Sequence, residues 1–182
     1  MCHFITAVLP SKAPHAELDI IARKHGRQFL PLSNPSIERQ LRSDQKYFLT
    51  TVGHCDCGTA LGFECRKERN ATNWAAEEQR LSKRGWSKAK VARALAQKRE
   101  GAAGSGAAQE QRTAAEIASW TDLIEESLAA DRTSEISLLL HFYGGTLDED
   151  ILLQEVEAVS DGSMTAEALR KMREDVLLLF RR

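Results

Sequence analysis

The middle of this 182-residue chain has a helical pattern, and strand-like segments lie on both sides of it. Residues 4–9 and 45–52 precede the helical region and residues 135–142 follow it, and their composition is typical of strands. If these strands form one sheet, the helical region connects the strands that precede it to the strand that follows it. The order predicts a single α+β domain over residues 1–182 with a compact antiparallel or mixed sheet, and a ferredoxin-like strand order is compatible with it.

The helical region, residues 66–131, begins with two predicted helices. Asn70 or Asn73 can cap the first helix, and Gly85 can end it. Ser87 can cap the second helix directly afterwards. Two helices separated by so short a connection are expected to pack against each other.

A glycine-rich stretch, residues 101–108, predicts a turn or flexible linker after the second helix. Thr113 and Glu116 have the spacing of a capping box, which predicts the start of a third helix. One face of that helix is apolar and carries Ile117, Trp120, Ile124 and Leu128. We therefore expect a long helical hairpin across the glycine-rich turn, as an insertion or crossover in the fold.

The C-terminal segment, residues 146–182, is acidic and is predicted to be an addition to the domain. The spacing of Leu152, Val156 and Val159 favours a helix over residues 151–159, although a strand also fits the composition. Residues 176–180 are predicted to form a final strand.

The charge of the chain is balanced only in total. There are 25 basic and 26 acidic side chains, but residues 66–100 carry a net charge of +7 and residues 110–182 a net charge of −9. The balance argues against a chain-wide binder of polyanions. In the predicted hairpin the basic second helix would lie beside the acidic third helix and be neutralised by it. We therefore expect a protein partner for the helical region, and neither a nucleic acid nor a membrane.

The cysteine content and the N-terminal residues indicate the cytoplasm. Four cysteines are too few for a disulfide-dense secreted scaffold, and the first ten residues lack the basic region of a signal peptide. No apolar run approaches the roughly 20 residues that a membrane span requires. In a reducing compartment, clustered cysteines indicate metal or redox chemistry before disulfides.

The most concentrated group of reactive side chains lies in one glycine-bracketed loop, residues 53–58, which contains His54, Cys55, Asp56 and Cys57. Thiolates bind zinc at about 2.3 Å and imidazoles at about 2.0–2.1 Å, usually in tetrahedral sets of four. Cys2, near the N-terminal strand, can complete such a set. The sequence predicts a metal site, with zinc as the expected ion, made by Cys2, His54, Cys55 and Cys57.

Two alternatives for the ligand set stay open at this point. His3 or Cys65 can take the place of Cys2. The direction of the strands decides whether Cys2 can take part. If residues 4–9 and 45–52 pair antiparallel, Cys2 lies beside the loop; if they run parallel, it is displaced by about 20 Å.

These features predict a small non-enzymatic protein in which a structural metal holds the loop and the helical region contacts a protein partner, as an inhibitor or immunity-type binder would. The alternative is a small thiol- or zinc-dependent hydrolase that uses Cys55 and Cys57, or Cys2 as the nucleophile. A structural zinc site has four protein ligands, whereas a catalytic zinc keeps one position open. A pocket beside the sulfurs, with an acid or base such as His3, His54 or Asp56 within reach, would favour the enzyme.

Overall fold

The computed structural model of the protein describes residues 2–62, 73–129, 132–159 and 162–181, with the backbone alone for residues 100–107 and 109. A six-stranded sheet has the order β2-β3-β1-β4-β6-β5. The strands are β1 (Cys2–Pro10), β2 (Leu30–Pro31), β3 (Gln45–Leu49), β4 (Glu135–Tyr143), β5 (Glu155–Val159) and β6 (Val176–Arg181). The helices are α1 (His15–Lys24), α2 (Pro35–Glu38), α4 (Trp74–Lys83), α5 (Lys88–Ala129) and α6 (Thr165–Arg170), with a short 3-10 helix, η1 (Gly162–Met164). The predicted α+β class with a mixed sheet is confirmed.

Strand β1 lies in the centre of the sheet and pairs antiparallel with both neighbours. Thr6 is opposite Leu49 of β3 and also opposite Leu139 of β4. A ferredoxin-like order would make β1 and β3 parallel neighbours, so this sheet is not of that type. Only the pairing of β5 with β6 is parallel among the described strands.

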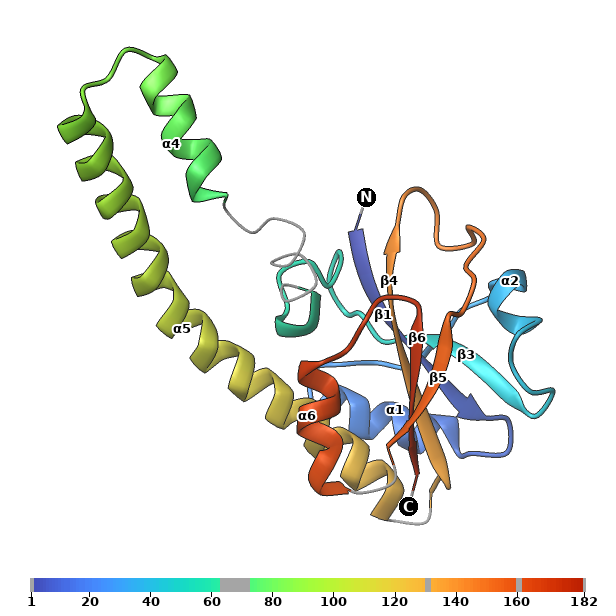
Figure 1. Ribbon diagram of the computed structural model, residues 1–182. Helices are drawn as coiled ribbons and strands as arrows, with labels where there is room; N and C mark the ends of the chain where they lie inside the picture. The colour runs from blue at the N-terminus through green and yellow to red at the C-terminus, as the bar shows by residue number, and fades with distance from the viewer. Residues whose placement is uncertain (1, 63–72, 130–131, 160–161, 182) are drawn as a thin grey trace.

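The two faces of the sheet bury different cores because side chains alternate along a strand. Ile5 of β1 faces the helices α1, α5 and α6, which lie on one side of the sheet in Figure 1. Val8 faces the other side, where Ile37 of the short helix α2 and Tyr143 of β4 pack against it. The predicted apolar face of residues 117–128 is confirmed as part of the helix-side core.

Helix α5 runs without a break through the glycine-rich stretch, so the predicted turn at residues 101–108 is wrong. Glycine costs about 1 kcal/mol relative to alanine inside a helix, and the alanine-rich neighbours offset this cost. Thr113 and Glu116 lie inside α5, so the predicted capping box is also wrong. At about 1.5 Å per residue the helix is roughly 60 Å long. Despite this length, neither α5 nor another helix in the described ranges is apolar enough to cross a membrane.

The helix pair that does form joins α4 to the first part of α5, as Figure 1 shows. Asn73 caps α4 by accepting a hydrogen bond from the backbone of Ala76, and Gly85 ends it with a φ of +78°. Asn70, the other predicted cap, lies outside the described residues. The two helices enclose a small apolar cluster of Leu81, Val91 and Leu95. We call residues 73–99 the arm, because Figure 1 shows this pair extending away from the sheet.

The C-terminal segment supplies strands to the main sheet. The predicted helix over residues 151–159 is wrong: β5 begins at Glu155 and pairs parallel with β6. Tertiary pairing outweighs the helical spacing here, since β6 offers a complete strand edge and places Val156 opposite Leu177. The predicted final strand is confirmed as β6.

Candidate metal centre

The antiparallel pairing of β1 and β3 brings the cysteine loop beside the first residues of the chain. After β3 the chain continues along β1: the backbone N–H of Thr50 donates to the carbonyl of Ile5, and that of Asp56 donates to the carbonyl of His3 at 2.8 Å. These bonds place the loop directly beside Cys2. This is the arrangement expected from the sequence if the two strands pair antiparallel.

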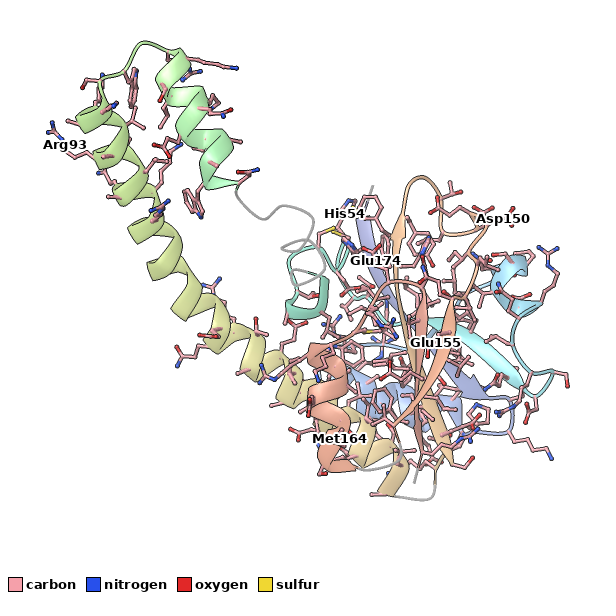
Figure 2. The ribbon with its side chains drawn as sticks, viewed as in Figure 1. His54, Arg93, Asp150, Glu155, Met164 and Glu174 are labelled. Carbon is pink, nitrogen blue, oxygen red and sulfur yellow. The ribbon has the colours of Figure 1, made fainter. Side chains whose placement is uncertain are left out.

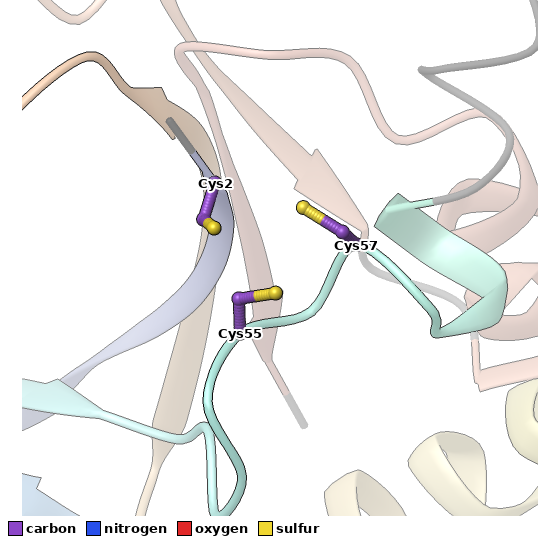
Figure 3. Close-up of side chains that lie close together, drawn as sticks. All are labelled: Cys2, Cys55 and Cys57. Atoms are coloured by element: carbon purple, nitrogen blue, oxygen red, sulfur yellow. The ribbon is translucent and has the colours of Figure 1, made fainter.

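Three sulfur atoms meet at this point. The Sγ atoms of Cys2, Cys55 and Cys57 all lie within 4.8 Å of one another, and Figure 3 shows the three side chains turned toward a common centre. All three cysteines are half-buried and form no disulfide. Tetrahedral coordination at about 2.3 Å would separate two sulfurs by roughly 3.8 Å, so this group is positioned to hold a metal ion.

The side chain of His3 lies beside Cys57 but is not part of the group of three converging sulfurs. Its backbone N–H donates to Cys57 Sγ at 3.2 Å, and its Nδ1 lies 3.9 Å from the same sulfur. On the opposite side of the ring, Nε2 is 2.7 Å from Oε1 of Glu174. When Nε2 carries the proton toward this carboxylate, Nδ1 presents its lone pair on the sulfur side.

The other two predicted ligands have different positions. His54 is exposed on the loop and is not part of the group of three sulfurs, and Figure 2 shows it near the end of β1. Cys65, the alternative ligand, lies outside the described residues. The structure thus brings together Cys2, Cys55 and Cys57 of the four predicted ligands.

Asp56, between the two loop cysteines, anchors the loop, a role that the sequence does not predict for it. Its side chain is 1% exposed, and its Oδ1 accepts a hydrogen bond from Nη1 of Arg27 at 2.6 Å. Its Oδ2 accepts from the backbone N–H of Ile5 at 2.8 Å and from the hydroxyl of Thr51. Because Asp56 is held in the interior, the cysteines on either side of it are directed away from the interior, toward Cys2.

Arg27 extends this buried network to helix α5. Its Nη2 donates to Glu116 at 2.5 Å, and its guanidinium lies 4.4 Å from the centre of the Trp120 ring. The other oxygen of Glu116 accepts from the backbone N–H of Ala60 at 2.6 Å. Glu116 therefore links α5 to the segment that follows the cysteine loop, in place of the capping role that the sequence predicts for it.

A glycine shapes the end of the same segment. Gly62 is buried against the backbone of Asp56, and a Cβ atom added at Gly62 would collide with the carbonyl oxygen of Asp56. The hydroxyl of Thr59 donates to that carbonyl at 2.8 Å. Gly58, in contrast, has open space around it.

A pocket of about 330 Å³ lies beside the cysteine loop, and Cys55 and Asp56 are among the residues that line it, whereas Cys2 and Cys57 are not. Arg27, Glu116 and Trp120 form part of its wall. An acid is thus near a thiol, as the enzyme alternative requires. Both oxygens of Asp56, however, already accept hydrogen bonds from Arg27, Thr51 and the backbone.

Comparison with models of protein families, with curated proteins and with solved structures finds no match to this chain.

Proposed function

We propose that this protein binds one zinc ion between Cys2, Cys55 and Cys57 and that the ion is structural. The observation that supports the proposal is the convergence of three thiol sulfurs within 4.8 Å, from two segments more than fifty residues apart in the chain. Sulfur ligands select zinc among the abundant divalent metals, which otherwise prefer oxygen or nitrogen. A reducing compartment such as the cytoplasm keeps these thiols available.

His3 supplies the fourth ligand in this proposal, through Nδ1. Its distance of 3.9 Å from Cys57 Sγ is close to the edge of a zinc tetrahedron, and its Nε2 hydrogen bond to Glu174 is the arrangement in which a carboxylate orients a zinc-bound histidine. His54, although predicted as a ligand, is exposed and has no comparable orienting contact in the described part of the chain.

The ion would connect the start of the central strand to the loop that follows β3. Four protein ligands leave no position for a substrate, so the site would stabilise the fold without catalysing a reaction. The arm is then the part of the molecule that contacts a partner. Its extension from the sheet supports this role, and a protein partner stays a prediction.

A zinc- or thiol-dependent hydrolase is the second candidate, because Cys55 lines a pocket of about 330 Å³. In that case His3 would not bind the ion, and a water molecule would occupy the fourth position. With Cys2 or Cys55 as a nucleophile, the protein would react covalently without a metal. The number of protein ligands on the ion separates these candidates.

Metal analysis of protein purified without a metal-binding tag tests the proposal. We expect one zinc per chain, lost in Cys55→Ser and Cys57→Ser. Cobalt in place of zinc should give the visible bands of a tetrahedral site with three sulfurs and one nitrogen. A protein that takes up no stoichiometric metal and is unaffected by chelators would exclude the proposal.

His3→Ala and His54→Ala form the matched pair that tests the fourth ligand. We expect the first to lower zinc affinity by at least about tenfold and to change the cobalt spectrum, and the second to leave both unchanged. If His54→Ala has the larger effect, His54 is the ligand instead. If neither variant alters the spectrum, the fourth position is open and the hydrolase candidate is favoured.

A further inference from the structure

The arm is strongly basic. Residues 73–99 contain eight lysines and arginines and two glutamates, a net charge of +6. Glu77 pairs with two of these cations, Arg80 and Lys98, and they lower its pKa to about 2. Six other cations are exposed and form no ion pair within the described ranges: Lys83, Arg84, Lys88, Lys90, Arg93 and Arg99.

The acidic part of the chain does not neutralise these cations. Because α5 is continuous, its basic first turns and its acidic last turns lie at opposite ends of one helix, roughly 60 Å in length. The acidic end packs on the sheet, whereas Arg93 lies on the arm, far from the sheet in Figure 2. The hairpin across residues 101–108, which would have placed acidic side chains beside these cations, does not form.

Helix stability does not explain where the cations are placed. Lys88 and Lys90 lie in the first turn of α5, which carries no acidic residue. The positive end of the helix dipole is at this terminus, so cations here are unfavourable by a few tenths of a kcal/mol each. Their position is better explained by an external anion.

The surface of the arm also lacks the anchors of a protein interface. Leu81, Val91 and Leu95 are buried between its two helices, and the large exposed hydrophobic side chains of the described residues all lie elsewhere. Trp86 and Trp74 are half-buried, with Lys90 and Arg99 over their rings at 4.2 and 5.4 Å. Protein interfaces are centred on well-packed aromatic, apolar or arginine side chains, whereas the affinity for a phosphate backbone comes mainly from the charges of lysine and arginine.

We infer that the arm binds the phosphate backbone of double-stranded nucleic acid. This partner takes the place of the protein predicted from the sequence, and the inference is independent of the zinc proposal. The two packed helices of the arm cannot enter the major groove together, since the groove is about 12 Å across and admits one helix. The covered tryptophans are not available for stacking on bases. Binding is therefore electrostatic and independent of base sequence, with phosphates on either side of a groove as the ligands.

Fluorescence anisotropy of a labelled 20-base-pair DNA duplex, titrated with the zinc-loaded full chain at several salt concentrations, tests the inference. We expect binding that weakens steeply with salt, with a slope of log K against log salt no steeper than about −5 for six cations. The double variant Lys88→Glu/Arg93→Glu should weaken binding by at least about tenfold at 100 mM salt.

The matched control is Lys12→Glu/Lys46→Glu, which makes the same change in charge at exposed positions outside the arm. It should change affinity by less than about threefold, since distant exposed charges are screened. Equal losses in the two double variants, or no binding at 50 mM salt, would overturn the inference. So would binding of a polyglutamate peptide by the arm without binding of the duplex, which would indicate an acidic protein partner. Circular dichroism checks that both variants keep the fold.

Discussion

Arg27 and Asp56 form a buried ion pair, 2.6 Å long, between the turn after α1 and the centre of the cysteine loop. Arg27 holds Glu116 of α5 with its other terminal nitrogen. One guanidinium thus joins the loop of the candidate metal centre to the long helix that carries the arm. Loss of the Asp56 carboxylate would leave Arg27 with Glu116 alone and would deprive the buried donors of Ile5 and Thr51 of their charged acceptor. Breaking a buried pair by removing one partner typically costs about 3–5 kcal/mol.

The first prediction concerns this ion pair. Asp56→Asn should lower the free energy of unfolding by about 3 kcal/mol or more, measured by urea denaturation in the presence of a chelator so that metal binding does not contribute. Arg173→Gln is the control, since Arg173 forms an exposed pair with Glu155 and its loss should change the free energy of unfolding far less. Equal effects of the two variants would show that the buried pair does not anchor the loop.

The second prediction concerns the glycine that packs against the loop. Gly62→Ala should destabilise the protein by about 1–3 kcal/mol and weaken zinc binding, because the new Cβ pushes on the carbonyl of Asp56, next to Cys57. Gly58→Ala, in the same loop but with open space around it, should leave both quantities nearly unchanged. Chemical denaturation and a zinc competition assay measure the two effects. If Gly62→Ala changes neither stability nor zinc affinity, the loop must shift readily to make room for the new Cβ atom.

The third prediction concerns the carboxylate behind His3. Glu174→Gln should reduce zinc affinity by about 10–100-fold, because the amide orients the imidazole less strongly than the carboxylate does. The number of zinc ions per chain at saturation should stay at one. Glu155→Gln, an exposed position on β5, should have no effect on affinity. If Glu174→Gln binds zinc as tightly as the wild type, His3 is not the fourth ligand in the way proposed.

The fourth prediction is a pH dependence that comes from the other face of the sheet. His141 lies between Asp175, 2.5 Å from Nδ1, and Glu149, 3.2 Å from Nε2. Burial alone would lower the pKa of His141, but the hydrogen bonds and charges of these two carboxylates outweigh it and raise the pKa above its usual 6.5. The charged imidazole is therefore favoured in the folded state. Its contribution to stability is complete below about pH 6.5 and is lost as the pH rises through the higher folded pKa.

His141→Gln isolates that contribution. The difference in free energy of unfolding between wild type and variant should be largest at pH 5.5 and should shrink by pH 9. Denaturation at each pH, with chelator present, measures the difference. A difference in free energy of unfolding that stays constant or increases with pH would contradict the prediction, whatever the absolute stabilities are.

Three of the strands follow from local sequence, whereas the convergence of the cysteines depends on a strand direction that the sequence left open. The composition of residues 4–9, 45–52 and 135–142 was sufficient to locate β1, β3 and β4. The antiparallel alternative for the first two then placed Cys2 beside the loop, and the structure has that arrangement. The roles of Arg27 and Asp56 could not be predicted, because a buried ion pair between residues 29 positions apart leaves no periodic pattern.

The errors in the prediction have a common physical cause, since tertiary contacts outweighed local preferences. Glycines at residues 101–106 predicted a turn, yet the helix continues because its last part is held in the core through Trp120 and Ile124. Glu116 had the spacing of a cap and instead binds Arg27. Residues 155–159 had helical spacing and instead complete the sheet. In each case the deciding partner is distant in sequence.

The central position of β1 has a consequence for synthesis on the ribosome. Its partner β3 and the cysteine loop follow within about sixty residues, whereas its second partner, β4, ends at Tyr143. One edge of β1 therefore stays unpaired while the whole of α5 is translated, and an unpaired edge is a template for aggregation. A metal bound by the nascent chain would hold the first half of the sheet together during that interval. Zinc supply during translation would then affect the yield of folded protein.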